Sequence, residues 1–157
     1  MTSTRHEAFI RCARLDEVEA LNELIMHSKS YWGYDRPFLE AYRAHLLLSP
    51  KALENDPVYC AEVGEAIAGV SHLIVVSDEE ICLDHLFVEP AFIGQGIGAL
   101  LWRHAVEQAR RWGARALVFG ADPHARSFYE RMGAVVVGEK LSRVLPGRKV
   151  PRMCYEL

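Results

Sequence analysis

A glycine-rich turn, Gly94-Gln95-Gly96-Ile97-Gly98, joins a strand-like segment to a strongly helical one. Residues 81–90 precede the turn and residues 99–109 follow it. Glycines let a backbone approach a phosphate, and the free N–H groups at a helix N-terminus point toward an anion. The helix dipole adds about half a positive charge at that end. The sequence therefore predicts a phosphorylated ligand near residues 93–99.

The composition excludes several classes of protein. The 157 residues are 50% hydrophobic and 25% charged, which is ordinary for a globular protein and predicts one domain over residues 1–157. A net charge of -3 without a run of Lys or Arg argues against nucleic acid as a partner. No apolar stretch approaches the length of a membrane span, so no membrane partner is expected either.

A cytoplasmic location is expected, because the N-terminus is too polar for a secretory signal. The four cysteines, Cys12, Cys60, Cys82 and Cys154, show no CxxC pairing and are expected to be reduced thiols. The seven histidines include no HExxH motif and no tight His/Cys cluster. No metal site is therefore predicted.

Hydrophobic periodicity and turn residues predict eleven elements in the order β-α-α-β-β-β-α-β-α-β-β, an α/β fold. Strands are predicted over 8–13, 58–63, 66–76, the run ending at 88, 115–120, 134–137 and 153–157. Helices are predicted from Asp16, as an N-cap, to about 30, from Pro37 to before Pro50, over 96–112, and over 122–132. Short turns between the second, third and fourth strands indicate an antiparallel meander.

This order and two motifs resemble the GNAT superfamily of acyl-CoA N-acetyltransferases over nearly the whole chain. Residues 83–101 resemble the family strand that ends in hydrophobic-x-V-x-P, followed by [Q/R]-x-x-G-x-[G/A] and a helix. Residues 122–134 resemble the family motif N-x-x-A-x-x-F-Y-E-x-x-G-F. The resemblance implies the GNAT fold, with a central mixed, mostly antiparallel twisted sheet of about seven strands flanked by four helices.

Two positions depart from the family pattern. Ile93 stands where the family usually has Arg or Gln, so a side-chain donor is lost and the backbone N–H groups must hold the pyrophosphate. Asp122 stands where the family usually has Asn. It can still cap the following helix, but an ionised carboxylate cannot donate a hydrogen bond to a cofactor. Somewhat weaker binding of the cofactor is expected from the change at Ile93.

The resemblance implies an enzyme that transfers the acetyl group of acetyl-CoA to a primary amine by direct attack in a ternary complex. The acceptor is a small molecule or a protein amine, and many relatives form homodimers. The residues that the resemblance assigns to the cofactor are Leu86, Phe87, Val88, Ile93, Gly94, Gln95, Gly96, Ile97, Gly98, Ala99, Asp122, Ala125, Ser127 and Phe128.

Acetyl transfer also needs an acid for the thiolate and a means of removing a proton from the amine. Tyr129 matches the family tyrosine near the thioester sulfur and is the candidate acid, although it could simply pack a helix onto the sheet. Asp84, His85 and Glu80 are candidate bases, with an ordered water as the fourth alternative. Strand alternation places Asp84 and His85 on opposite faces, so only one can point at the substrate.

The acceptor pocket is expected near the connection between the first two helices. Tyr31, Trp32 and Tyr34 could form a flat wall for an apolar or cationic acceptor, or could pin the loop to the core. Asp35 could attract an amine or cap the helix at Pro37.

Two other functions fit parts of the sequence. Gly94-x-Gly96-x-x-Ala99 also fits the dinucleotide fingerprint, with Asp122 in the place of a ribose-binding acid. However, that fingerprint belongs to the first unit of a parallel sheet, whereas three hairpin-like strands precede it here. The second alternative is a non-catalytic sensor that binds acetyl-CoA, and retention of Tyr129 argues for the enzyme instead.

Overall fold

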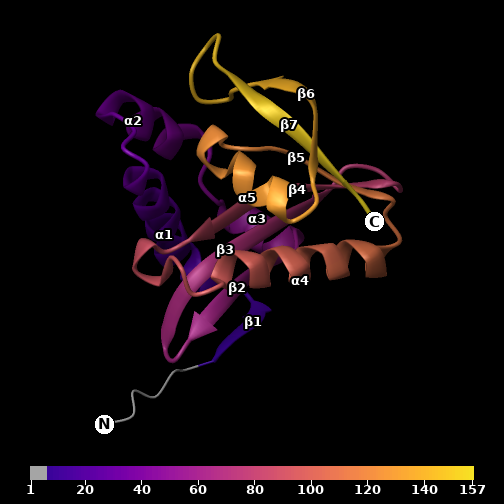
Figure 1. The fold of residues 1–157 in the computed structure, drawn as a ribbon. Coiled ribbons are helices and arrows are strands. Elements are labelled where there is room, and N and C mark those ends of the chain that lie inside the picture. The colour runs from indigo at the N-terminus through magenta and orange to yellow at the C-terminus, as the bar shows by residue number, and fades with distance from the viewer. Residues whose placement is uncertain (1–6) are drawn as a thin grey trace.

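The computed structural model of the protein describes residues 7–157. The described strands form one seven-stranded sheet in the order β1-β2-β3-β4-β5-β7-β6, and Figure 1 labels each of them. The strands are β1 (Ala8–Cys12), β2 (Val58–Val63), β3 (Ala66–Val75), β4 (Glu80–Val88), β5 (Ala116–Gly120), β6 (Val135–Leu141) and β7 (Lys149–Glu156). The α-helices are α1 (Val18–Tyr31), α2 (Arg36–His45), α3 (Pro50–Asn55), α4 (Ile97–Trp112) and α5 (Arg126–Arg131).

The mixed, mostly antiparallel sheet of the sequence prediction is confirmed, since only β4 and β5 pair in parallel among the described strands. The helices differ in number, because five are present where four were expected. Pro50 does not merely follow a helix: it begins α3, whose first turn is capped by the Ser49 side chain accepting from the N–H of Ala52. Proline suits this position because its missing N–H would have no partner there.

Two local expectations were wrong. Asp16 does not cap α1, because residues Leu15–Glu17 form a short 3-10 turn in which Glu17 accepts the N–H of Arg14 at 2.8 Å. The last two strands form a hairpin that is longer than predicted. Charged residues at its end, among them Lys140 and Lys149, interrupt the apolar alternation by which strands are recognised.

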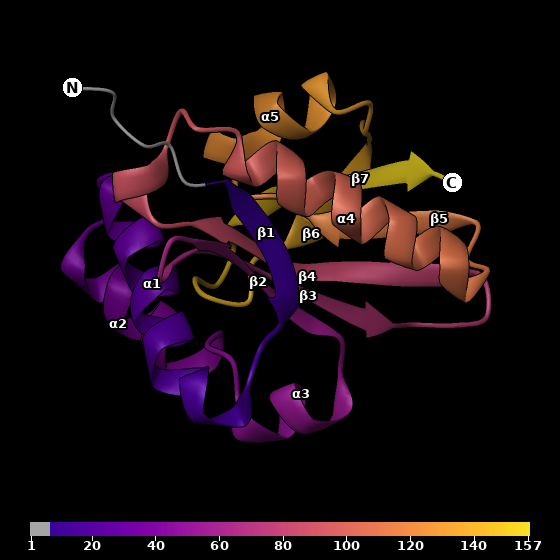
Figure 2. The ribbon, with the colours of Figure 1, turned by 90° about the horizontal axis from the view of Figure 1, so that it is seen from below.

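The helices cover the two faces of the sheet. Figure 2 shows α1 and α2 on one side and α4 and α5 on the other. On the first face, Leu21 and Ile25 of α1 pack with Cys60 and Val70 of the sheet, and all four are fully buried. On the second face, a separate cluster joins α4, α5 and β5. Among residues 7–157 no helix is both long and apolar enough to span a bilayer.

The sheet opens between its two central strands. β4 and β5 pair only through Glu80, Ile81 and Cys82 of β4, which face residues 116–118. Beyond this point β4 continues to Val88 without a partner on that edge among the described residues. Backbone N–H and C=O groups in such an edge must be satisfied by something else. The opening therefore exposes main-chain groups of β4 in the middle of the fold.

Replacement of Gly69 by alanine tests how closely α4 packs on β3. A Cβ atom at Gly69 would lie 2.7 Å from Leu101 Cδ1 and 3.0 Å from the Phe87 carbonyl oxygen. Gly69→Ala should therefore lower the free energy of unfolding by about 1–3 kcal/mol in urea denaturation. Gly138→Ala is the control, because its Cβ meets nothing within 4 Å and should change stability by about 0.5 kcal/mol or less. Equal effects of the two variants would contradict the packing.

Candidate active site

A cavity of about 580 Å³ occupies the opening between β4 and β5. This volume is in the usual range for a ligand site. The predicted cofactor residues on its wall are Leu86, Phe87, Val88, Ile93, Gly94, Gly96, Ile97, Gly98, Ala99, Asp122, Ala125, Ser127 and Phe128. Gln95 is the one member of the predicted set that is not on the wall. The fold thus brings two distant sequence motifs to one cavity.

The glycine-rich turn has the geometry of an anion site. Gly94 and Gly96 have φ angles of +86° and +79°, a left-handed conformation that disfavours other residues. Gly96 is the N-cap of α4 and offers no capping side chain, and the first bond of that turn runs from Leu100 N–H to the Gly96 carbonyl. The N–H groups of Ile97, Gly98 and Ala99 precede that bond and have no partner within the helix. A Cβ on Gly96 would enter open space, which leaves room for a ligand.

Tyr129 of α5 lies on the cavity wall and is only 7% exposed. Its ring packs against Phe119 and Phe128, with centroids 4.5 and 5.2 Å away. Burial, together with the negative charge of Asp122, raises the pKa of Tyr129. The phenol therefore stays protonated at neutral pH and can donate a proton into the cavity. Packing and a role as an acid are compatible in this position.

Asp122, at the end of β5, takes part in a buried ion pair. Its Oδ2 accepts from Lys29 Nζ at 2.6 Å and from the Tyr34 hydroxyl at 2.7 Å, and its Oδ1 accepts the N–H of His124. The Tyr34 oxygen in turn accepts from Arg148 at 2.9 Å. Burial alone would raise the pKa of Asp122, but the Lys29 cation outweighs burial and lowers it. Asp122 therefore caps its turn as predicted, and it also joins β5 to α1.

Lys29 is a buried residue of the cavity wall that the sequence did not reveal. Its ammonium lies 4.8 Å from the ring centroid of Tyr42 and 5.5 Å from those of Tyr34 and Phe87. Burial lowers the pKa of Lys29, and Asp122 partly opposes that effect. A lysine at the end of an amphipathic helix is ordinarily solvated. The one available signal was an aspartate in place of the usual Asn, which is the change expected if a cation lies nearby.

The predicted acceptor aromatics have different environments. Trp32 lies on the cavity wall and stacks on His124, with centroids 5.3 Å apart and planes inclined by 7°. Tyr34 is stacked on Phe38, and burial with the Asp122 hydrogen bond raises the pKa of Tyr34 to about 12. Tyr31 is off the wall and 55% exposed. Asp35 caps α2 by accepting from the N–H of Phe38 at 3.0 Å.

A β-bulge in β4 lies at the candidate base Asp84, directly before the second candidate, His85. His72 pairs with His85 and Leu73 pairs with Leu83, so Asp84 is the extra residue of β4. Asp84 lies on the cavity wall, where its Oδ1 accepts from Arg143 at 3.1 Å. His85 is buried in a small neighbouring pocket and does not line the main cavity. Glu80, at the closed end of the opening, does not line the cavity either.

The ion pair can be tested by a double-mutant cycle on Lys29 and Asp122. Asp122→Asn leaves a buried ammonium without its counter-charge and should lower the free energy of unfolding at pH 7 by about 3–5 kcal/mol. In the Lys29→Met background the same change should cost much less, because no cation remains to be stranded. Urea denaturation of the four proteins measures both effects. Additive losses would show that the pair is not coupled.

The family model described as acetyltransferase (GNAT) family matches residues 18–134. A comparison with curated protein sequences gives no match. Among solved structures, a GCN5-related N-acetyltransferase (aminotransferase, class II) from Rhodopseudomonas palustris is 17% identical, with 100% of each chain covered and a TM-score of 0.81.

Two further solved structures are similar over most of the chain. The PaiA N-acetyltransferase of Thermoplasma acidophilum, solved in complex with coenzyme A, is 17% identical over 96% of this chain and 99% of its own, with a TM-score of 0.74. The ribosomal-protein-S18-alanine N-acetyltransferase of Escherichia coli is 17% identical over 96% and 94%, with a TM-score of 0.71. At these identities the likeness shows a shared fold.

Proposed function

Because the chain belongs to the acetyltransferase (GNAT) family, we propose that it transfers the acetyl group of acetyl-CoA to a primary amine. The observation that carries the proposal is one cavity that holds the glycine-rich turn at one part of its wall and a protonated, buried Tyr129 at another. The open edge of β4 forms the wall between them. The reaction proceeds by direct attack of the amine in a ternary complex.

The cofactor is held mainly by backbone groups. Its pyrophosphate would lie on the free N–H groups of Ile97, Gly98 and Ala99, and its pantetheine arm would follow the unpaired edge of β4 from Leu86 to Val88. Ile93 is apolar and 46% exposed, so it supplies contact area and no charge. The Asp122 carboxylate already accepts hydrogen bonds from Lys29, from Tyr34 and from a backbone N–H of its own turn. Its part is to hold the cavity wall in place while Ala125, Ser127 and Phe128 face the cofactor.

Acetyl transfer requires a proton donor for the departing thiolate and a path by which the amine proton leaves. The amine nitrogen attacks the thioester carbon, and a backbone N–H of the open β4 edge faces the oxygen on which negative charge develops. When the C–S bond breaks, the thiolate takes the phenol proton of Tyr129. The amine nitrogen gives its own proton to solvent, and the phenolate is then reprotonated. No covalent enzyme intermediate is needed.

An ordered water carries the amine proton away. Of the three candidate bases only Asp84 lies on the wall, and both of its oxygens already have neighbours, Arg143 at Oδ1 and His85 at Oδ2. Its carboxylate therefore attracts and orients the cationic form of the acceptor more effectively than it takes a proton. Trp32 offers a flat apolar surface on the same wall. These two features favour an acceptor amine that carries an apolar group.

The alternative functions receive less support. The non-catalytic sensor would need no acid, whereas Tyr129 places a phenol on the cavity wall. Detectable acetyl transfer to any amine separates the two. A dinucleotide-binding oxidoreductase requires a largely parallel sheet, but the described strands contain one parallel pair, of three residues on each strand.

Pairing of two copies is part of the proposal. β6 is exposed along its whole length at one edge of the sheet. Its apolar side chains Val135, Val137 and Leu141 are 58%, 57% and 65% exposed. Exposed apolar edge strands pair readily with a further strand, so β6 of a second copy is the expected partner. Light scattering in solution measures the mass.

Replacement of Tyr129 by phenylalanine tests the acid. Tyr129→Phe removes the proton donor but keeps the ring packing, so kcat should fall by roughly 10²-fold while the Kd for acetyl-CoA changes little. Tyr155→Phe is the control, because Tyr155 packs on the same Trp102 but does not line the cavity. Steady-state kinetics with calorimetry give both quantities. Unchanged turnover in Tyr129→Phe removes the assignment.

Replacement of Gly96 by valine tests the phosphate site. The valine side chain would enter the open space beside the turn, so Gly96→Val should abolish binding of acetyl-CoA in calorimetric titration. Gly113→Val is the matched control, because Gly113 ends the same helix with a similar φ of +94° and its Cβ also meets nothing. Gly113→Val should strain the backbone as Gly96→Val does, but its affinity for acetyl-CoA should be unchanged. NADH serves as a second ligand that should not bind to the unmodified protein.

A further inference from the structure

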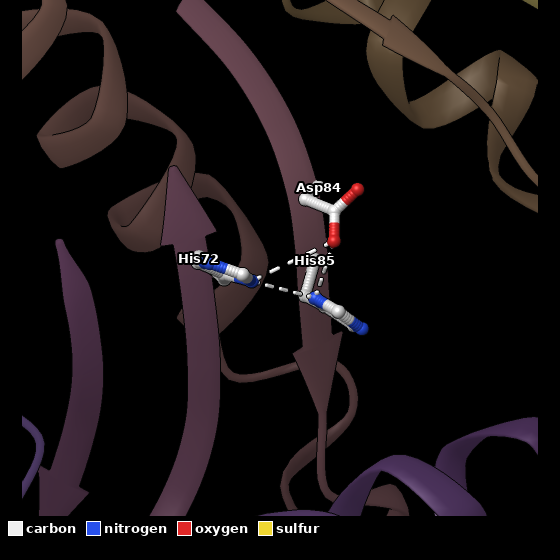
Figure 3. A group of neighbouring side chains, drawn as sticks. All are labelled: His72, Asp84 and His85. Carbon is white, nitrogen blue, oxygen red and sulfur yellow. Dashed lines mark hydrogen bonds and ion pairs between the residues drawn. The ribbon is translucent and has the colours of Figure 1, made fainter. Parts of the chain in front are cut away.

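Three side chains converge on one point beside the main cavity. His72 comes from β3, and Asp84 and His85 come from β4, as Figure 3 shows. The two Nδ1 atoms of the histidines are 3.0 Å apart. Asp84 Oδ2 lies 3.2 Å from the Nδ1 of His85 and 3.6 Å from that of His72. Both histidines are buried, with exposures of 4% and 5%.

The outer nitrogens of the two rings fix where their hydrogens lie. His72 Nε2 is 2.9 Å from a carboxylate oxygen of Asp56, and His85 Nε2 is 2.7 Å from the carbonyl oxygen of Leu46. Both of these oxygens can only accept, so each Nε2 carries a hydrogen. In a neutral imidazole the other nitrogen then presents a lone pair. The two Nδ1 atoms therefore face each other, and Asp84 Oδ2, without a hydrogen between them.

Three acceptors that converge in this way favour a bound cation. A proton sits on one of the three atoms and reaches the other two only through a three-centre hydrogen bond, whereas a metal ion can bind all three directly. Ligands at about 2.05 Å from a tetrahedral zinc ion lie roughly 3.3 Å from one another. The three separations, 3.0, 3.2 and 3.6 Å, bracket that value. Two imidazoles and a carboxylate are also ligands that zinc commonly takes in proteins.

The surroundings of the cluster match those of known metal ligands. A metal-bound histidine usually donates its second N–H to a carboxylate or a backbone carbonyl, and a bound carboxylate is itself hydrogen-bonded. Asp56 and the Leu46 carbonyl fill the first role here. Arg143 fills the second, because it binds Oδ1 of Asp84 and leaves Oδ2 toward the histidines. A pocket of about 150 Å³ adjoins the three side chains and has room for a water as the fourth ligand.

We propose that His72, Asp84 and His85 bind a divalent transition-metal ion, with Zn²⁺ as the best match. The sequence predicted no metal site, because the two histidines are on different strands and form no known spacing motif. The β-bulge creates the site, because Asp84 has no pairing partner on β3 and its carboxylate lies beside the paired His72 and His85. No step of the proposed acetyl transfer passes through the ion, but the two proposals share Asp84, whose Oδ2 would bind the ion while its Oδ1 stays with Arg143. Metal binding is therefore tested by direct titration and not by activity.

Direct titration with metal tests the site. The full chain without an affinity tag is stripped with a chelator and titrated with Zn²⁺ by calorimetry, and with Co²⁺ by visible absorption. We expect one ion per chain and the absorption of a tetrahedral Co²⁺ complex. Asp56→Ala, which removes an outer partner, should weaken binding by roughly 10- to 100-fold. Asp84→Asn and His85→Gln remove ligands and should weaken it further.

Two controls separate loss of the site from loss of the fold. Asp84→Asn keeps the size of a side chain at the cavity wall, and Zn²⁺ should raise Tm of the unmodified protein but not of this variant. His27→Gln, a change on the exposed face of α1, should bind as the unmodified protein does. Gly96→Val should also retain the metal, which distinguishes this site from the cofactor site. Absence of stoichiometric binding, or unchanged affinity in both ligand variants, would overturn the proposal.

Discussion

The short pairing of β4 with β5 is the constraint on which the rest of the structure depends. Three residues on each strand hold the two halves of the sheet together, and the remainder of β4 has an open edge. Unpaired main-chain groups inside a fold are costly unless a ligand or water satisfies them. The cavity is therefore a consequence of strand geometry, and the glycine-rich turn, which directly follows β4 and a short 3-10 turn, is delivered to its rim.

The opening needs a second connection to keep its shape, and the Lys29–Asp122 pair supplies it. The pair joins α1 to the turn after β5, and both residues line the cavity. A buried ion pair is seldom a large net source of stability, but it is costly to break. The pair therefore fixes geometry more than it adds free energy. The departure of Asp122 from the family pattern becomes understandable, because an Asn could not neutralise a buried lysine.

Sequence patterns predicted the elements well where the pattern is local. Apolar periodicity and turn residues located the meander and α4, and the two motifs located the cavity wall. The patterns failed where a residue's partner is distant in sequence. Lys29 lies 93 residues before Asp122, and no local feature marks it as buried. Likewise, strand alternation separates Asp84 from His85, and only the bulge, a property of the β3–β4 pairing, brings Asp84 Oδ2 and His85 Nδ1 to 3.2 Å.

The hairpin of β6 and β7 has a consequence for how such a chain can change over evolution. Residues 142–148 connect its strands, and two arginines from this connection reach the cavity, Arg143 at Asp84 and Arg148 at Tyr34. Both lie beyond the segment, 18–134, that matches the family. The proposed acceptor side of the cavity is thus partly built by a peripheral segment, while the glycine-rich turn belongs to the segment that matches the family. Substitutions in the hairpin can alter the choice of acceptor without disturbing the part of the site that is common to the family.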